Sequence, residues 1–518
     1  MTDRPKIDAP AMPALAAAWR WWLPPALLTL SLALIFIDPF AGDWDALDYT
    51  VLAVKGRPSS MLFGRLLFIF TNHALWRAAH ALCGLQPEHA YLLFKYAVVA
   101  QSPLATIACW ALARELTRDV RAATLGALLV ALSPFYVLYS GQAMTEIPSL
   151  MWLGAGLTVH LRGLLQQRIR LVLAGAALLG LSMNIREGAM FYGTWLVLGP
   201  FICGWQTGRR AVTIVLLSGI IFLVCALGGW AYWFLMNVGG YRHEWYGWLY
   251  SLQVESARHP VSFWNLGPLM LYFFIAAPLV LVALPVAAYR EWAERGLSPA
   301  LGLAAAGFLA NIMMVFQYSV TVNGRYLLTG LPALAPLAAR YFMGAETRRT
   351  GSKDRAFVVA ALSITLVMVM IGGMLYAVVR PTIESHSDTK EYRERLALLP
   401  RDAVVMAGKE TVAVTFWRGM GLGEWEAIGT GAGWPGDKLV DVIEHHLRQG
   451  RRVFLDADPR WWSTHGWQLE ETRAMINLES RFRFRRVSET IYEIRPPDDR
   501  TALDAPDLSA KFNVKDSK

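Results

Sequence analysis

Three carboxylates stand close together early in the chain, at Asp43, Asp45 and Asp48 within residues 42–49. Carboxylate oxygens bind hard divalent cations such as Mg²⁺ or Mn²⁺, and a carboxylate can also take a proton from an attacking hydroxyl. A third interpretation is a solvated loop, since clustered acidic residues are often merely exposed. Residue type and spacing leave all three interpretations open. If a metal ion binds, Asp43, Asp45 and Asp48 would be its ligands.

Ionisable residues also stand beside three later apolar runs. They are Glu146, Arg186 and the pair Arg325-Tyr326. Each arginine could extend to lipid headgroups or pair with a nearby acid, Glu146 or Glu187. If these residues and the acidic segment all lie on one side of a membrane, their positions favour one shared polar cavity.

Long apolar runs predict such a membrane. The chain of 518 residues is 55% hydrophobic and 17% charged, with a mean hydropathy of +0.34, whereas soluble proteins carry about a quarter charged residues. Apolar runs alternate with short charged loops, which predicts an α-helical polytopic membrane protein with about eleven spans. The spans lie near residues 22–37, 91–113, 122–139, 147–161, 171–185, 189–205, 211–235, 267–288, 299–318, 326–343 and 356–379.

Arginines in the short loops predict the orientation. One set of loops and the N-terminal tail are rich in Arg, so the positive-inside rule places them in the cytoplasm. The alternate loops then lie outside, at residues 38–90, 140–146, 184–188, 236–266, 319–325 and everything after 380. Loop 38–90 departs from the rule because it holds Arg57, Arg65 and Arg77, but long loops are weak determinants of topology.

Four regions follow from these boundaries. They are a cytoplasmic tail at 1–21, a membrane domain at 22–380, an extracytoplasmic α/β domain at 381–497 and a disordered tail at 498–518. Within the external loop 38–90, residues 59–82 have helical spacing. They predict a helix that lies along the membrane surface or packs against the spans.

The α/β prediction depends on alternating patterns. Apolar runs at 403–406 and 453–455 alternate with helical patterns at 437–449 and 469–477, which is typical of a small layer with a partly parallel sheet. Residues 431–436 match G-x-G-x-x-G, but they lack the strand, helix and acidic residue of a nucleotide site and are interpreted as a loop.

Nucleic acid is excluded as a partner. The net charge of +9 comes from basic residues spread over helix ends rather than gathered in one patch. The cysteines are scattered and form neither a disulfide framework nor a metal-binding spacing. A lipid bilayer is therefore the partner that the composition indicates.

The ordered motifs resemble those of the GT-C superfamily of membrane glycosyltransferases, in particular protein mannosyltransferases and lipid A aminoarabinose transferases. The resemblance covers most of residues 20–380. It depends on Asp45 to Tyr49 with Ala53 and Gly56, on Thr145-Glu146, on Arg186-Glu187-Gly188, and on Arg325-Tyr326 with Pro332 and Pro336. Many relatives have adjacent Asp-Glu in the first motif, whereas here Trp44 separates Asp43 from Asp45.

The resemblance implies an inverting transfer of a sugar from a polyprenyl-phosphate-linked donor. Asp45 or Asp43 would be the base, with Glu146 orienting the acceptor or an arginine. Arg325 is the first candidate for binding the donor phosphate and Arg186 the second, with Tyr326 beside them. Some relatives use Mg²⁺ or Mn²⁺ and others do not, so a metal cofactor is permitted but not required.

The predicted function is therefore a glycosyltransferase of a bacterial inner membrane, acting on an envelope lipid, glycan or protein at the outer face. A transporter or lipid flippase is the first alternative, although the spans lack charges near the midplane and no internal repeat is visible. A catalytically inert membrane scaffold that presents the α/β domain is the second, and the carboxylate and arginine set argues against it.

Overall fold

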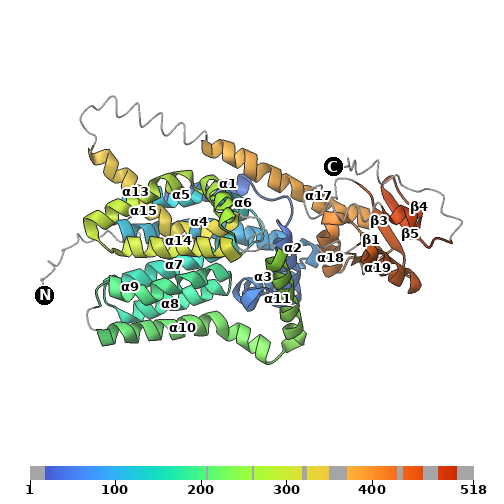
Figure 1. Cartoon of the computed structure of the whole chain (residues 1–518), viewed down its shortest axis with the longest axis horizontal. Helices are drawn as coiled ribbons and strands as arrows, with labels where there is room; N and C mark the ends of the chain where they lie inside the picture. Colours follow the sequence, from blue (N-terminus) through green and yellow to red (C-terminus); the bar gives the residue numbers. More distant parts are fainter. Residues whose placement is uncertain are drawn as a thin grey trace.

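The computed structural model describes residues 18–205, 208–258, 262–317, 324–348, 370–428, 436–458 and 477–498. A bundle of helices forms one part of the molecule and a small strand-bearing unit the other, with a long helix, α17 (Arg380–Leu396), running from one to the other (Figure 1). The predicted span 356–379, the G-x-G-x-x-G match, the helical pattern at 469–477 and both chain ends fall largely or wholly outside the described residues.

The bundle is helical throughout its described length. Its helices are α1 (Trp19–Ile35), α4 (Ala90–Thr117), α5 (Val120–Ala131), α6 (Pro134–Ser140), α7 (Glu146–Leu165), α8 (Ile169–Met183), α9 (Gly193–Ile202), α10 (Gly208–Leu235), α12 (Leu266–Ala276), α13 (Pro278–Arg295), α14 (Pro299–Gln317) and α15 (Leu331–Arg348). Many large apolar side chains face outward, and on α10 Leu216 is 60% exposed and Val224 64%. Such an apolar exterior suits contact with lipid.

Length and hydropathy qualify two described helices as membrane spans, Pro87–Thr117 and Gly208–Leu235. Two further pairs qualify if each bent pair counts as one span: α5 with α6, bent by 68°, and α12 with α13, bent by 107°. The sequence predicted one continuous span for each pair. Pro134 and Pro278 begin the second helix in each case, because proline lacks an amide donor and disfavours helical geometry at the residue before it.

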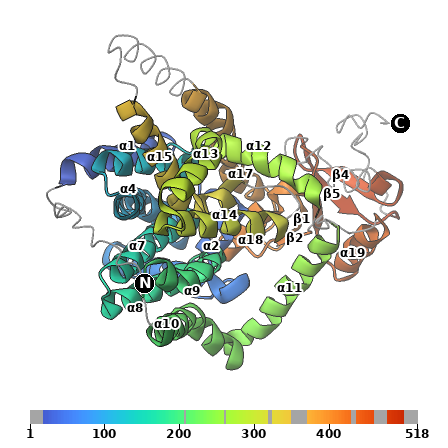
Figure 2. The same cartoon turned by 60° about the vertical axis from the view of Figure 1, so that its left-hand side comes forward.

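One end of the bundle, called here the site end, carries the helices and turns that follow α1 and α10. These are α2 (Trp44–Lys55), the 3-10 turn η2 (Leu62–Arg65), α3 (Leu66–Cys83), η3 (Pro87–His89), η5 (Val238–Gly240) and α11 (Tyr241–Arg258). The helix predicted over 59–82 corresponds to η2 and α3. Figure 2 shows α11 rising from the end of α10 on the side of the strand-bearing unit.

The strand-bearing unit contains one mixed sheet. Its strands are β1 (Val404–Met406), β2 (Glu426–Ala427), β3 (Val453–Asp456), β4 (Arg483–Arg486) and β5 (Ile491–Arg495), in the order β2-β1-β3-β5-β4. Strand β1 pairs in parallel with β2 and β3, and β5 pairs antiparallel with β3 and β4. The predicted partly parallel sheet is confirmed. The accompanying helices are α18 (Thr411–Gly419) and α19 (Gly436–Arg448).

Candidate active site

The acidic segment begins a helix rather than forming a loop. Asp43 is the N-cap of α2, and its carboxylate accepts a hydrogen bond from the Trp44 amide at 2.6 Å. This capping satisfies an amide that the helix itself leaves unpaired, so an Asp at this place favours helix formation. Asp45 and Asp48 then lie one turn apart on α2. The interpretation of this segment as a loop is therefore wrong.

Glycine makes the approach to α2 possible. Gly42 has a φ of 129°, and a Cβ there would lie 2.6 Å from the side-chain oxygen of Gln142. That same oxygen accepts a hydrogen bond from the Asp43 amide at 3.2 Å. A larger residue at 42 would break both the backbone geometry and this contact.

Arg325 joins three of the predicted carboxylates. Its Nη1 lies 2.8 Å from Asp45 and 3.4 Å from Asp43, and its Nε lies 3.8 Å from Glu146. The Arg325 side chain is 14% exposed. Gly324 allows the arginine to enter here, because a Cβ at 324 would stand 2.0 Å from the ring of Phe135.

Arg186 lies deeper than Arg325 and pairs with the same acid. Arg186 forms an ion pair with Glu146 in which both side chains are almost fully buried. Its Nη1 also donates to the Thr145 hydroxyl at 3.3 Å. The ring of Tyr326 lies 5.1 Å from the Arg186 guanidinium carbon and 5.3 Å from that of Arg325. Tyr326 therefore lies beside both arginines, in cation–π contact.

A second buried pair, Arg65 with Glu187, completes the cluster, and sequence reasoning did not place it there. Arg65 Nη2 lies 3.0 Å from Glu187, and its Nη1 donates to the Thr145 hydroxyl at 2.8 Å. One feature of the sequence could have revealed Arg65: it is an arginine in loop 38–90, which the positive-inside rule would otherwise keep poor in basic residues. A buried, paired arginine contributes nothing to the exposed loop charge on which that rule depends.

Burial and like charges make the acids of α2 unequal. Burial, reinforced by the charge of Asp45 and opposed by that of Arg325, raises the pKa of Asp43 above its ordinary value. Desolvation on α2 together with the charge of Asp45 raises the pKa of Asp48 to about 6, while Arg65 opposes the rise, although part of the Asp48 side chain is exposed to solvent. Asp48 therefore takes up a proton in mildly acidic solution.

A metal site does not form from the α2 acids. Within the described residues, no three His, Cys, Asp or Glu side chains gather in a way that could hold an ion. Asp43 and Asp45 instead face the guanidinium of Arg325. The residues as arranged do not fit Mg²⁺ or Mn²⁺.

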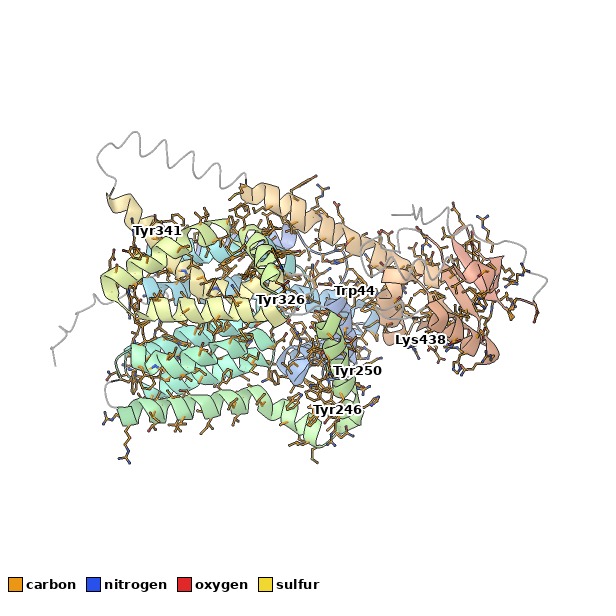
Figure 3. The ribbon with its side chains drawn as sticks, in the orientation of Figure 1. Trp44, Tyr246, Tyr250, Tyr326, Tyr341 and Lys438 are labelled. Carbon is orange, nitrogen blue, oxygen red and sulfur yellow. The ribbon has the colours of Figure 1, made fainter. Side chains whose placement is uncertain are left out.

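The cluster lies where the bundle meets the strand-bearing unit. Figure 3 shows Trp44 and Tyr326 at this end, whereas Tyr341 lies at the opposite end of the bundle. Its members come from the start of α2, η2, the start of α7, the start of η4 (Glu187–Tyr192) and η7 (Gly324–Thr329). The structure thus brings together Asp43, Asp45, Glu146, Arg186, Arg325 and Tyr326, which are all site candidates from the sequence, and leaves Asp48 at the cluster's margin.

Solved structures resemble this fold along nearly its whole length. ArnT from Cupriavidus metallidurans bound to undecaprenyl phosphate aligns with a TM-score of 0.58 and 13% identity, covering 93% of this chain and 98% of that chain. This chain therefore shares the fold of ArnT. The oligosaccharyltransferase AglB from Archaeoglobus fulgidus, in complex with an inhibitory peptide and a dolichol-phosphate, aligns at 0.54 and 12%, covering 94% and 75%.

The apo form of the Archaeoglobus fulgidus oligosaccharyltransferase aligns similarly, with a TM-score of 0.54 and 12% identity over 86% of this chain and 70% of that chain. No protein-family profile matches the sequence, and no curated protein matches it. The GT-C likeness is therefore one of three-dimensional structure. It agrees with the resemblance drawn from the motif order in the sequence.

Proposed function

We propose that this protein transfers a sugar from a polyprenyl-phosphate-linked donor to an envelope lipid, glycan or protein, with inversion, at the outer face of a bacterial inner membrane. The observation that carries the proposal is the position of Arg325. Its guanidinium lies between Asp45 and Asp43 and next to Glu146. A phosphate-binding group and two candidate bases therefore meet at one point.

Exchange of partners at Arg325 would link donor binding to activation of the base. A donor phosphate offers the guanidinium two oxygens in the geometry that its planar fork prefers. Binding there would draw Arg325 away from Asp45, leaving that carboxylate free to accept the proton of the acceptor hydroxyl. As the glycosidic bond breaks, charge grows on the departing phosphate, and Arg325, now paired with that phosphate, stabilises it.

The buried pair of Glu146 and Arg186 would hold Arg325 in position for this step. Glu146 accepts from Arg186 and also lies near Arg325. It therefore holds the two cations in a fixed relation although they would repel each other. Attack by the acceptor from the side opposite the phosphate would invert the anomeric centre, with Asp45 as the first candidate base and Asp43 as the second.

An apolar groove beside the cluster suits a lipid carrier. Side chains on one face of α3 line an open hollow of about 540 Å³. They are Leu67, Phe70, Thr71, Ala74, Leu75 and Ala78. The groove begins two residues after Arg65, so a phosphate near the arginines would place the first isoprene units over this face. The undecaprenyl phosphate bound to ArnT and the dolichol-phosphate bound to AglB are lipids of this class.

The test is transfer by the purified protein in lipid nanodiscs. A panel of radiolabelled polyprenyl-phosphate sugars is offered with envelope lipid extract, and labelled product is resolved from donor. We expect one donor to give product together with free polyprenyl phosphate. The same protein is also reconstituted in sealed vesicles. A lipid flippase would move the donor from one leaflet to the other and leave the sugar attached, and that result without product would refute the proposal.

The proposed orientation has a separate test that uses a native residue. Cys83 is exposed at the end of α3, on the site end. With the other cysteines replaced, Cys83 should react with an impermeant thiol reagent in intact cells. A cysteine substituted for Leu297, which is exposed after α13, should react only after permeabilisation. Labelling of the opposite kind would place the site in the cytoplasm.

A further inference from the structure

The segment that leads into α2, residues 38–43, is held by a buried acid and a distant histidine. One carboxylate oxygen of Asp38 accepts from the Phe40 amide at 2.8 Å, and the other lies 2.5 Å from Nδ1 of His386. The Asp38 side chain is 0% exposed and that of His386 14%. His386 lies on α17, 348 residues along the chain from Asp38.

Two other contacts hold the same segment from different sides. Lys95 of α4 donates to the backbone carbonyls of Asp38 at 2.7 Å and Phe40 at 3.2 Å. The ring of Phe40 packs against Phe416 and Trp417 of α18, with centroid distances of 5.1 and 5.4 Å. The Phe40 ring also packs against Tyr91 of α4, with a centroid distance of 4.9 Å. The bundle therefore holds both the backbone of the segment and this ring, and α18 of the strand-bearing unit contacts the ring as well.

The histidine matters because the acid it pairs with has no access to water. A buried carboxylate without a partner is costly, so loss of His386 would drive Asp38 toward solvent. Asp38 cannot move without the backbone that leads to Asp43, which caps α2. The position of Asp45 in the first turn follows from the same backbone.

We propose that His386 is a positioning residue: by holding Asp38, it fixes segment 38–43 and so sets Asp43 and Asp45 against Arg325. The catalytic consequence rests on the proposed transferase function, whereas the positioning itself does not. The α17 helix and the strand-bearing unit that follows it are then part of the machinery that builds the site, rather than an appended module.

The charges around His386 give a pH-dependent readout. Burial lowers the pKa of His386, but the hydrogen bond and charge of Asp38 outweigh it, with smaller contributions from Asp43 and Glu410, so the pKa is raised overall. Lys95 faces the opposite side of the same acid through the Asp38 carbonyl. The charged pair is complete below the ordinary histidine pKa and is lost as pH rises through the raised value.

Hydrogen exchange tests the positioning without any assay of activity. In the full-length protein in detergent, peptides within residues 38–48 should exchange about tenfold faster in His386→Ala than in the wild type. Peptides from α10 should not change. His445→Ala removes an exposed histidine from α19 of the strand-bearing unit and should leave residues 38–48 unchanged. Equal exchange in His386→Ala and wild type would overturn the inference.

Kinetics test the catalytic consequence. His386→Ala should lower kcat about tenfold and leave the KM for donor nearly unchanged, because Arg325 remains. His386→Asn keeps an amide donor near the position of Nδ1 and should restore most of kcat, while losing the decline at high pH that titration of His386 produces.

A double-mutant cycle decides whether His386 acts through Asp38. Asp38→Asn should reduce kcat as His386→Ala does, and the double variant should be no slower than either single variant. Additive losses would refute the inference. If the wild type transfers sugar from no donor, the transferase proposal fails, and hydrogen exchange still decides the positioning role.

Discussion

The two ends of the helical bundle both carry arginine–carboxylate pairs, but they bury them differently. At the opposite end, Glu115 pairs with Arg162, and Glu291 pairs with Arg295 and Arg340. The acids there are 7% and 4% exposed, while Arg162 and Arg295 are 41% and 51% exposed. These arginines keep their heads in water and cover a buried acid with their stems.

At the site end two pairs bury both partners. Arg186 and Glu146 are 4% and 1% exposed, and Arg65 and Glu187 are 6% and 5%. Taking two charges out of water costs several kcal/mol per ion and is recovered only with good geometry. A fold that needed only stable helix ends would use the cheaper arrangement of the opposite end. The buried pairs therefore indicate a site where charge must act without water.

The largest expected effect follows replacement of the base. Asp45→Asn keeps the size of the side chain and removes its capacity to accept a proton, so transfer should slow by at least about a hundredfold. Protein yield, thermal stability and polyprenyl phosphate binding are measured alongside. If Asp43→Asn is inactive and Asp45→Asn is not, Asp43 is the base. Full activity in both variants would contradict the catalytic assignment.

Arg325→Lys tests directly whether an arginine at the site end has a role that an arginine at the opposite end lacks. Lysine keeps the charge but loses the fork that suits phosphate, so transfer should fall about tenfold or more. The matched control is Arg290→Lys at the opposite end, since Arg290 also lies over a tyrosine, Tyr341, at 4.9 Å. The control should transfer normally. Near-normal transfer by Arg325→Lys would move the phosphate role to Arg186.

Asp48→Asn tests whether the charges at the site end make the stability of the protein depend on pH. The folded pKa of Asp48 is raised to about 6, so the native state holds a proton that the unfolded state releases, and stability falls as pH rises through this interval. The variant should match the wild type near pH 4 and melt slightly higher near pH 7 (about one unit above the raised pKa). The gain should be small because Asp48 is exposed and solvent screens its charge. Its transfer rate should change far less than that of Asp45→Asn.

An acid outside the site cluster supplies the control for that measurement. Asp441 lies exposed on α19, so Asp441→Asn should show no pH-dependent gain in melting temperature. Calorimetry from acidic to neutral solution compares the two variants. An equal gain in both would assign the effect to net charge rather than to the surroundings of Asp48.

The smallest effect is expected at the opposite end. Arg295 is half exposed and its contact with Glu291 is 3.9 Å long, and exposed pairs of this kind contribute little. Arg295→Gln should change the free energy of unfolding by less than about 0.5 kcal/mol and leave transfer unaltered. A large loss of transfer would show that the two ends are coupled.

Much of the site was predictable because its residue types are rare in apolar sequence. Asp45, Glu146, Arg186 and Arg325 stand out as charges beside long apolar runs, where few other charges occur. These residues could be assigned to one face of the membrane because they lie in alternate loops, and every second loop is on the same side. The same reasoning could not assign partners.

The sequence by itself determined the helical bundle, the mixed sheet and the set of ionisable residues that meet. Only the tertiary structure decided that Arg186 pairs with Glu146 rather than with its neighbour Glu187, which pairs with Arg65. It also decided that Asp43 caps a helix and that His386 meets Asp38. Periodicity and composition report which face of a local element is apolar. Pairing between buried charges depends on distances and desolvation across the folded chain, and no local pattern records them.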